Sequence, residues 1–137
     1  MKILIICTGN TCRSQMAEGF LKSLNHSTEV YSAGTHAEHR VNPYAVEVMA
    51  EIGIDISRQT PKSVDLFLND SFDYVITVCD GAKDVCPNFS GNVAHHKHIG
   101  FEDPADAKGS REEVLAVYRK VRNQIIKAFT SFNDSIK

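Results

Sequence analysis

The sequence has no large excess of charge of either sign. It contains 15 basic and 17 acidic residues, mixed along its 137 positions, for a formal net charge of -2 at pH 7. A protein without a basic stretch is not expected to bind nucleic acid or an anionic membrane surface. Any site for an anion must therefore be built locally, from a few residues.

Long apolar runs, repeats and low-complexity segments are also absent from the sequence. The opening apolar run ends at Cys7, and Gly9, Asn10 and Arg13 follow it at once. Such a run is too short and wrongly flanked for a signal peptide or a membrane-spanning helix. With 42% hydrophobic and 23% charged residues, the chain has the size and balance of one domain with its own core. We expect a soluble, cytoplasmic monomer.

Short apolar strands alternate with helical patterns along the chain. Strands are predicted at 2–7, 30–32, 74–79 and, more weakly, 93–99. Helices are predicted at 14–24, 43–52, 64–68 and 110–132. The last helix begins with a capping box at Ser110 and carries an apolar stripe at Val114, Tyr118, Val121, Ile125 and Phe129. This alternation predicts an α/β fold with a parallel sheet covered by helices on both faces, binding ligands at the carboxyl ends of its strands.

Cys7 lies at such a strand end and begins the loop Cys7-Thr8-Gly9-Asn10-Thr11-Cys12-Arg13-Ser14. The small and polar residues of this loop allow successive backbone N–H groups to form, with the following helix N-terminus, a nest for an anion. Arg13 can hold two oxyanion oxygens with its planar fork, and its charge is expected to lower the pKa of Cys7. We predict that residues 8–14 bind an oxyanion and that the Cys7 thiolate attacks it. Cys12 is expected to be packed rather than reactive.

These eight residues resemble the phosphate-binding loop of the low-molecular-weight protein tyrosine phosphatases and of the arsenate reductases built on that fold. The similarity extends through the segments Gln15 to Gly19, Tyr31 to Gly34, Asp55 to Ser57 and Gly100 to Ala105. It implies one domain over residues 1–137 with a four-stranded parallel sheet, and catalysis without a metal or an organic cofactor. It also implies that Asp103 protonates the leaving oxygen.

Two further cysteines favour the reductases within this family. Cys79 and Cys86 match in position the second and third catalytic cysteines of thioredoxin-coupled arsenate reductases. The resemblance implies that Cys7 bonds arsenate, that Cys79 releases arsenite, and that a Cys79–Cys86 disulfide is then reduced by thioredoxin. Such a relay would serve arsenic detoxification. Ala105 stands where the phosphatases usually carry an aromatic residue, which also favours a reductase.

Alternatives remain for the same residues. The chain could be a tyrosine phosphatase that uses only Cys7, Arg13 and Asp103, or a non-catalytic redox sensor whose thiols form a signalling disulfide. The two later cysteines could instead be structural. A zinc site is disfavoured because no C-x-x-C pair is present, and it would have to combine Cys79 and Cys86 with His95, His96 and His98.

Some members of the family hold a potassium ion beside the loop with an Asn, a Glu, a Ser and an Asp. The first three match Asn10, Glu18 and Ser32, but the Asp aligns with Lys62. Because a lysine would repel a cation, we expect its ammonium to take the ion's place, pairing with Glu18 and helping to fix Asn10. A solvated surface lysine is the alternative.

Overall fold

The apolar run that opens the chain forms an inner strand of the sheet. In a computed structural model, which describes residues 1–79 and 90–136, the strands β1 (Lys2–Cys7), β2 (Glu29–Gly34), β3 (Phe72–Thr77) and β4 (Val93–His98) pair in the order β2-β1-β3-β4. All three pairings are parallel. The predicted four-stranded parallel sheet is confirmed. Residues 3–6 are fully buried, which explains why this strand reads as a continuous apolar run.

Two of the helices begin where the sequence places their caps. The helices are α1 (Arg13–Leu24), α2 (Pro43–Ala50), α4 (Arg111–Ser135) and the short 3-10 helices η1 (Val64–Phe67) and η2 (Pro104–Asp106). Asn42 caps α2, and Ser110 forms the predicted capping box with Glu113. Helix α2 ends two residues earlier than predicted, since the chain turns at Gly53, where φ is +80°. Among the described residues, no helix is long and apolar enough to cross a membrane.

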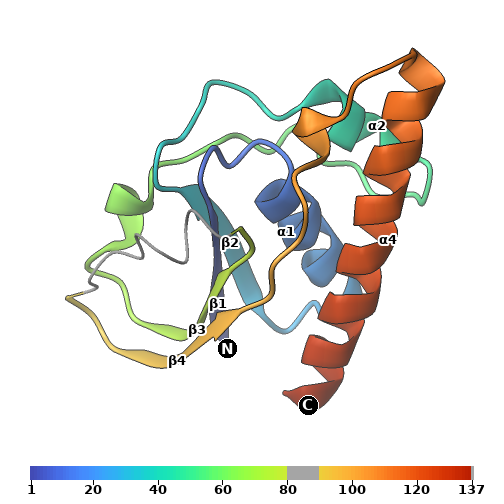
Figure 1. Ribbon diagram of the computed structural model, residues 1–137. Coiled ribbons are helices and arrows are strands. Elements are labelled where there is room, and N and C mark those ends of the chain that lie inside the picture. Colours follow the sequence, from blue (N-terminus) through green and yellow to red (C-terminus); the bar gives the residue numbers. More distant parts are fainter. Residues whose placement is uncertain (80–89, 137) are drawn as a thin grey trace.

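Elements of the described residues lie on both faces of the sheet (Figure 1). Helices α1 and α4 pack against each other on one face, and α2 packs beside them. The buried stripe of α4 follows the predicted positions, except that Leu115 is buried and Val114 lies partly exposed. On the other face, η1 contributes Phe67, whose ring contacts those of Tyr31 and Phe72. Helices α1 and α4 therefore share one face of the sheet. Helix α1 begins at the end of the predicted anion loop.

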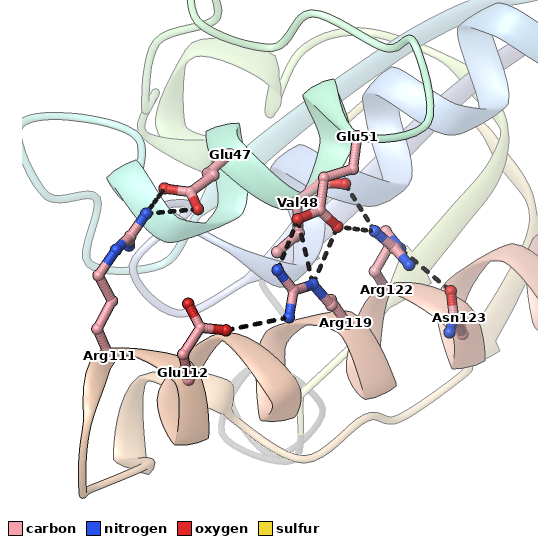
Figure 2. Close-up of polar contacts among 8 residues, drawn as sticks. All are labelled: Glu47, Val48, Glu51, Arg111, Glu112, Arg119, Arg122 and Asn123. Atoms are coloured by element: carbon pink, nitrogen blue, oxygen red, sulfur yellow. Dashed lines mark hydrogen bonds and ion pairs between the residues drawn. The ribbon is translucent and has the colours of Figure 1, made fainter.

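Helix α2 is tied to α4 by charged side chains at the surface, of which only that of Arg122, at 11% exposure, is largely covered (Figure 2). Arg111 donates to both carboxylate oxygens of Glu47, each at 2.7 Å. Glu51 accepts from Arg119 and from Arg122, the latter at 2.8 Å. We refer to these five residues as the α2–α4 ion-pair cluster. They fix how α2 lies on α4.

Candidate oxyanion site

The loop of residues 7–14 joins the end of β1 to the start of α1, as predicted. Its residues 7–13 line a cavity of about 250 Å³ together with His36 and Glu38, from the segment after β2, and with Asp103 and Ala105, from the start of η2, whereas Ser14 is buried behind the loop. These segments gather at the carboxyl end of the sheet (Figure 1). The cavity therefore lies where a parallel sheet is expected to bind its ligand.

Backbone hydrogen bonds hold this loop from its outer side. The segment 35–42 donates its N–H groups to successive loop carbonyls: Thr35 to Cys7 at 3.1 Å, His36 to Thr8 at 2.9 Å, Glu38 to Gly9 at 3.0 Å and Asn42 to Thr11 at 2.8 Å. The loop N–H groups are used differently. Within the part of the chain that the structure describes, those of residues 9–12 donate to no protein acceptor. Helix α1 also starts without a side-chain cap. Free N–H groups beside an uncapped helix N-terminus suit an anion.

Asn10 fixes the turn of the loop. It is fully buried and has a φ of 57°, in the left-handed region that costs energy for a residue other than glycine. Its Nδ2 donates to Ser14 Oγ at 2.8 Å and to Ser32 Oγ at 3.0 Å. Its Oδ1 accepts from the Lys62 backbone N–H at 2.9 Å. These bonds from three segments offset the backbone strain, so the loop shape is set by the fold.

Gln15 is a supporting residue that the sequence analysis missed. It is fully buried, and its Nε2 lies 3.0 Å from the Asn10 carbonyl, 3.1 Å from Asn10 Oδ1 and 3.1 Å from the Thr60 carbonyl. Gln59 donates in turn to Gln15 Oε1 at 2.7 Å. The signal in the sequence was a polar residue, Gln15, at a position directly after the loop that faces the buried side of α1. We call Asn10, Ser14, Gln15, Glu18 and Ser32 the loop-support network.

Glu18 joins this network, but Lys62 does so differently from the expectation. The nearly buried Glu18 carboxylate accepts from Ser32 Oγ at 2.6 Å and pairs with Lys22 at 2.7 Å. The Lys62 ammonium donates to the Thr60 carbonyl at 2.8 Å. The expected Lys62–Glu18 pair is therefore wrong, because Lys22, one helical turn after Glu18, takes that place. Asn10 is held by the Lys62 backbone, not by its ammonium.

Two lysines lie near the Glu18 carboxylate. Burial lowers the pKa of the Lys62 ammonium, while the nearby Glu18 carboxylate acts to raise it. Glu18 is thus paired with Lys22 and also interacts through its charge with Lys62, without direct contact. Over residues 1–79 and 90–136, no three side chains of His, Cys, Asp or Glu come together as a metal site. The histidines of β4 lie exposed.

Arg13 lies at the cavity with Asp103. Its Nη1 donates to the Phe101 carbonyl at 3.0 Å, and its Nη2 lies 3.4 Å from Asp103 Oδ2. Its Nε is buried without a hydrogen-bond partner in the described residues. A buried donor without an acceptor is costly, and an oxyanion in the cavity would supply one. Asp103 also accepts from the Ala105 N–H at 3.0 Å, which fixes its carboxylate at the start of η2.

Cys7 and Cys79 lie together, although 72 positions separate them in the sequence. The Cys7 thiol is buried close to that of Cys79, whose sulfur lies 3.3 Å from the Oγ1 of Thr8, the next residue in the chain. The Cys79 contact and burial raise the pKa of Cys7, against the opposing charge of Arg13. The expected lowering of the Cys7 pKa by the charge of Arg13 is present, but the neighbouring Cys79 thiol and burial outweigh it.

Cys12 is buried in the core, and burial raises the pKa of its thiol, which suits a packed and unreactive residue. Cys86, the predicted third thiol, lies outside the described residues. The other three cysteines are free thiols. The described part of the site is therefore a reduced thiol pair at the bottom of an oxyanion loop.

Comparisons with known proteins identify the family of this chain. A family model described as low molecular weight phosphotyrosine protein phosphatase matches residues 2–137. The chain is 50% identical to an arsenate reductase of Halalkalibacterium halodurans over 136 residues, 98% of this chain and 96% of that protein. A solved arsenate reductase in its oxidized state is similar with a TM-score of 0.83 at 33% identity, covering 99% and 98% of the two chains. A thioredoxin-dependent arsenate reductase of Corynebacterium glutamicum gives a TM-score of 0.64 at 28% identity, over 98% of this chain and 62% of that one.

Proposed function

Because the chain belongs to the low molecular weight phosphotyrosine protein phosphatase family and shares half of its residues with an arsenate reductase, we propose that it reduces arsenate to arsenite. The observation that carries this proposal is the contact between the Cys7 and Cys79 thiols at the oxyanion loop. Hydrolysis of a phosphate ester needs one nucleophilic thiol. Reduction of arsenate needs two electrons, and a pair of adjacent thiols supplies them by forming a disulfide.

The first step joins arsenate to Cys7. The free N–H groups of residues 9–12 and the Arg13 guanidinium hold the oxygens, and the Cys7 thiolate attacks arsenic. One arsenate oxygen leaves as water after taking protons, one of them from Asp103. This step forms a sulfur–arsenic bond and leaves arsenic in its higher oxidation state.

The second step transfers the electrons. The Cys79 thiolate attacks the Cys7 sulfur, forming a Cys7–Cys79 disulfide, and the electron pair of the sulfur–arsenic bond moves to arsenic. Arsenite then leaves. The short distance between the two thiols supports this step, because the attacking sulfur needs little movement. The Thr8 hydroxyl, 3.3 Å from the Cys79 sulfur, is placed to donate a hydrogen bond to its thiolate.

The last steps restore the enzyme. In the proposed relay, the Cys86 thiolate attacks the Cys79 sulfur, releasing Cys7 and forming a Cys79–Cys86 disulfide. A thioredoxin then reduces that disulfide by the same exchange chemistry. Support for thioredoxin as the partner comes from the similar Corynebacterium glutamicum enzyme, which is thioredoxin-dependent.

The test is arsenate reduction by the purified protein with thioredoxin and its reductase, beside hydrolysis of an aryl phosphate. Cys7→Ser should abolish both activities, because the serine hydroxyl stays protonated where a thiol ionises. Cys86→Ser should release about one arsenite per enzyme and then stop, since two thiols supply one pair of electrons. Normal turnover of Cys86→Ser would overturn the relay.

The family name favours a second candidate, a tyrosine phosphatase that uses Cys7, Arg13 and Asp103 alone. Its organic leaving group would lie beside Ala105, which offers no ring for stacking. Aryl phosphate hydrolysis that is unaffected by Cys79→Ser, together with no arsenate reduction, would favour this candidate.

A further inference from the structure

Glu38 lies at the mouth of the oxyanion cavity. Its backbone N–H donates to the Gly9 carbonyl at 3.0 Å, which fixes the residue over the loop. Its side chain lines the same cavity as Cys7 and Arg13. The carboxylate lies so close to Gly9 that a Cβ atom there would be only 2.5 Å from Glu38 Oε2.

The carboxylate of Glu38 is exposed and has no ion pair or hydrogen bond with any described residue. This is unusual beside an anion site, where the other nearby carboxylate, Asp103, is paired with Arg13. An unpaired carboxylate keeps its charge at low cost only while water solvates it. Any group that covers Glu38 must therefore displace that water.

We propose that Glu38 is a specificity-determining residue that selects free oxyanions over phosphate esters at this site. The inference deepens the proposed function and rests on it for the oxyanion site. Three oxygens of a tetrahedral oxyanion face the loop, and the fourth faces the mouth. In arsenate the fourth oxygen is small and leaves Glu38 in water. In an ester it carries an organic group, which covers the carboxylate without offering it a donor.

Ala105 supports the same role. It lines the cavity with Glu38, and its methyl group offers an ester little contact area in return. An ester bound at the mouth would therefore cover the Glu38 charge, which costs free energy, and gain little from apolar contact with Ala105. His36, the other side chain at this edge, is exposed and has no partner among the described residues either, so it does not neutralise Glu38.

The test compares binding of inorganic phosphate and of phenyl phosphate, at a pH where both are dianions, by titration followed by NMR. The variant Glu38→Gln removes the charge and keeps the shape and the backbone bond to Gly9. Glu29→Gln, an exposed glutamate at the opposite end of β2, is the matched control for the loss of one charge. In the parent protein phenyl phosphate should bind more weakly than phosphate. Glu38→Gln should narrow the ratio of the two Kd values about fivefold, and Glu29→Gln should leave it unchanged.

The outcomes separate this inference from the proposed function. If Glu38→Gln leaves the ratio of the two Kd values unchanged, or strengthens binding of both ligands equally, the selective role is overturned. An equal gain would mean that the Glu38 charge repels both anions alike. Failure of phosphate to bind the parent protein would overturn the oxyanion site and both proposals. A narrowed ratio in a protein that reduces no arsenate would support Glu38 as the selector and overturn only the proposed reaction.

Discussion

Two polar clusters in this protein differ both in their surroundings and in their charge. The loop-support network lies beneath the oxyanion loop, and its five residues are each at most 3% exposed. The α2–α4 ion-pair cluster lies at the surface, where the side chains of Arg111 and Glu47 are 58% and 39% exposed. The first cluster consists mainly of neutral amides and hydroxyls, whereas the second consists of full charges.

The difference shows where a hydrogen bond determines structure. At the surface, water replaces a lost partner, so an exposed ion pair contributes little. In the interior no water is available to replace a lost hydrogen-bond partner, so the remaining buried polar group is left unsatisfied. The buried network can therefore hold Asn10 in a strained conformation, and the surface cluster mainly sets how two helices lie together. Four expected outcomes test this comparison.

The largest effect should come from Gln15→Leu. Leucine fills similar space but leaves the Asn10 carbonyl, the Thr60 carbonyl and the Gln59 side chain without their partner. We expect a loss of about 2–4 kcal/mol in the free energy of unfolding, together with weaker phosphate binding. Denaturant unfolding and phosphate titration measure the two effects. Gln124→Leu, at an exposed position of α4, is the control, and an equal loss there would contradict the assignment.

The next effect concerns the thiol pair beside the network. Because the Cys79 contact raises the pKa of Cys7, Cys79→Ala should lower that pKa and speed alkylation of Cys7 at neutral pH. The rate of iodoacetamide labelling at Cys7, followed by mass spectrometry from neutral to alkaline pH, gives the pKa directly. Cys12→Ala, which removes a thiol outside the pair, should leave that profile unchanged. An unshifted profile in Cys79→Ala would mean that Cys79 does not control Cys7.

A smaller effect is expected at Lys62. Its backbone N–H holds Asn10, and alanine keeps that bond, while the ammonium donates only to the Thr60 carbonyl. Lys62→Ala should cost about 1 kcal/mol or less, a typical value for one partly exposed hydrogen bond. Exchanging sodium for potassium at constant ionic strength should leave unfolding of the parent protein unchanged. Clear stabilisation by potassium would show that the two lysines near Glu18 do not exclude a cation.

The smallest effect should appear in the ion-pair cluster. Hydrogen bonds from Arg119 and Arg122 lower the pKa of Glu51, so its stabilising contribution is present above the unfolded-state pKa. That contribution is lost as the pH falls through the lower folded-state pKa. Glu51→Gln should therefore lower the melting temperature slightly at neutral pH and low salt, and the difference should vanish in acid or in high salt. Thermal melts across pH and salt measure it, and a difference that persists in high salt would contradict a solvent-exposed cluster.

The elements of the fold were largely predictable from local pattern. The apolar run before Cys7 gives β1, and the cap residues Asn42 and Ser110 place the starts of α2 and α4. The predicted stripe of α4 was wrong at Val114, because Val114 and Leu115 are both apolar and only packing decides which of them is buried. The oxyanion loop was predictable because its residues are contiguous.

The supports of the site were harder to predict, since they come from distant segments. The pairing of Glu18 with Lys22 rather than with Lys62 depends on how side chains fill one small space. The contact of Cys79 with Cys7, which reverses the expected pKa shift, also arises only from the folded chain. Glu38 gave no signal in sequence, because an exposed glutamate in a loop is ordinary until its neighbours are known.

The backbone bonds from residues 35–42 to the loop carbonyls have a consequence for the entropy of binding. These bonds, with those to Asn10, fix the loop before any ligand arrives, so an oxyanion does not have to order it. Ordering flexible chain on binding costs free energy, and a preformed site avoids that cost. A small ligand makes few contacts and has little affinity to lose. A rigid loop is thus what allows an anion of only five heavy atoms to be held at all.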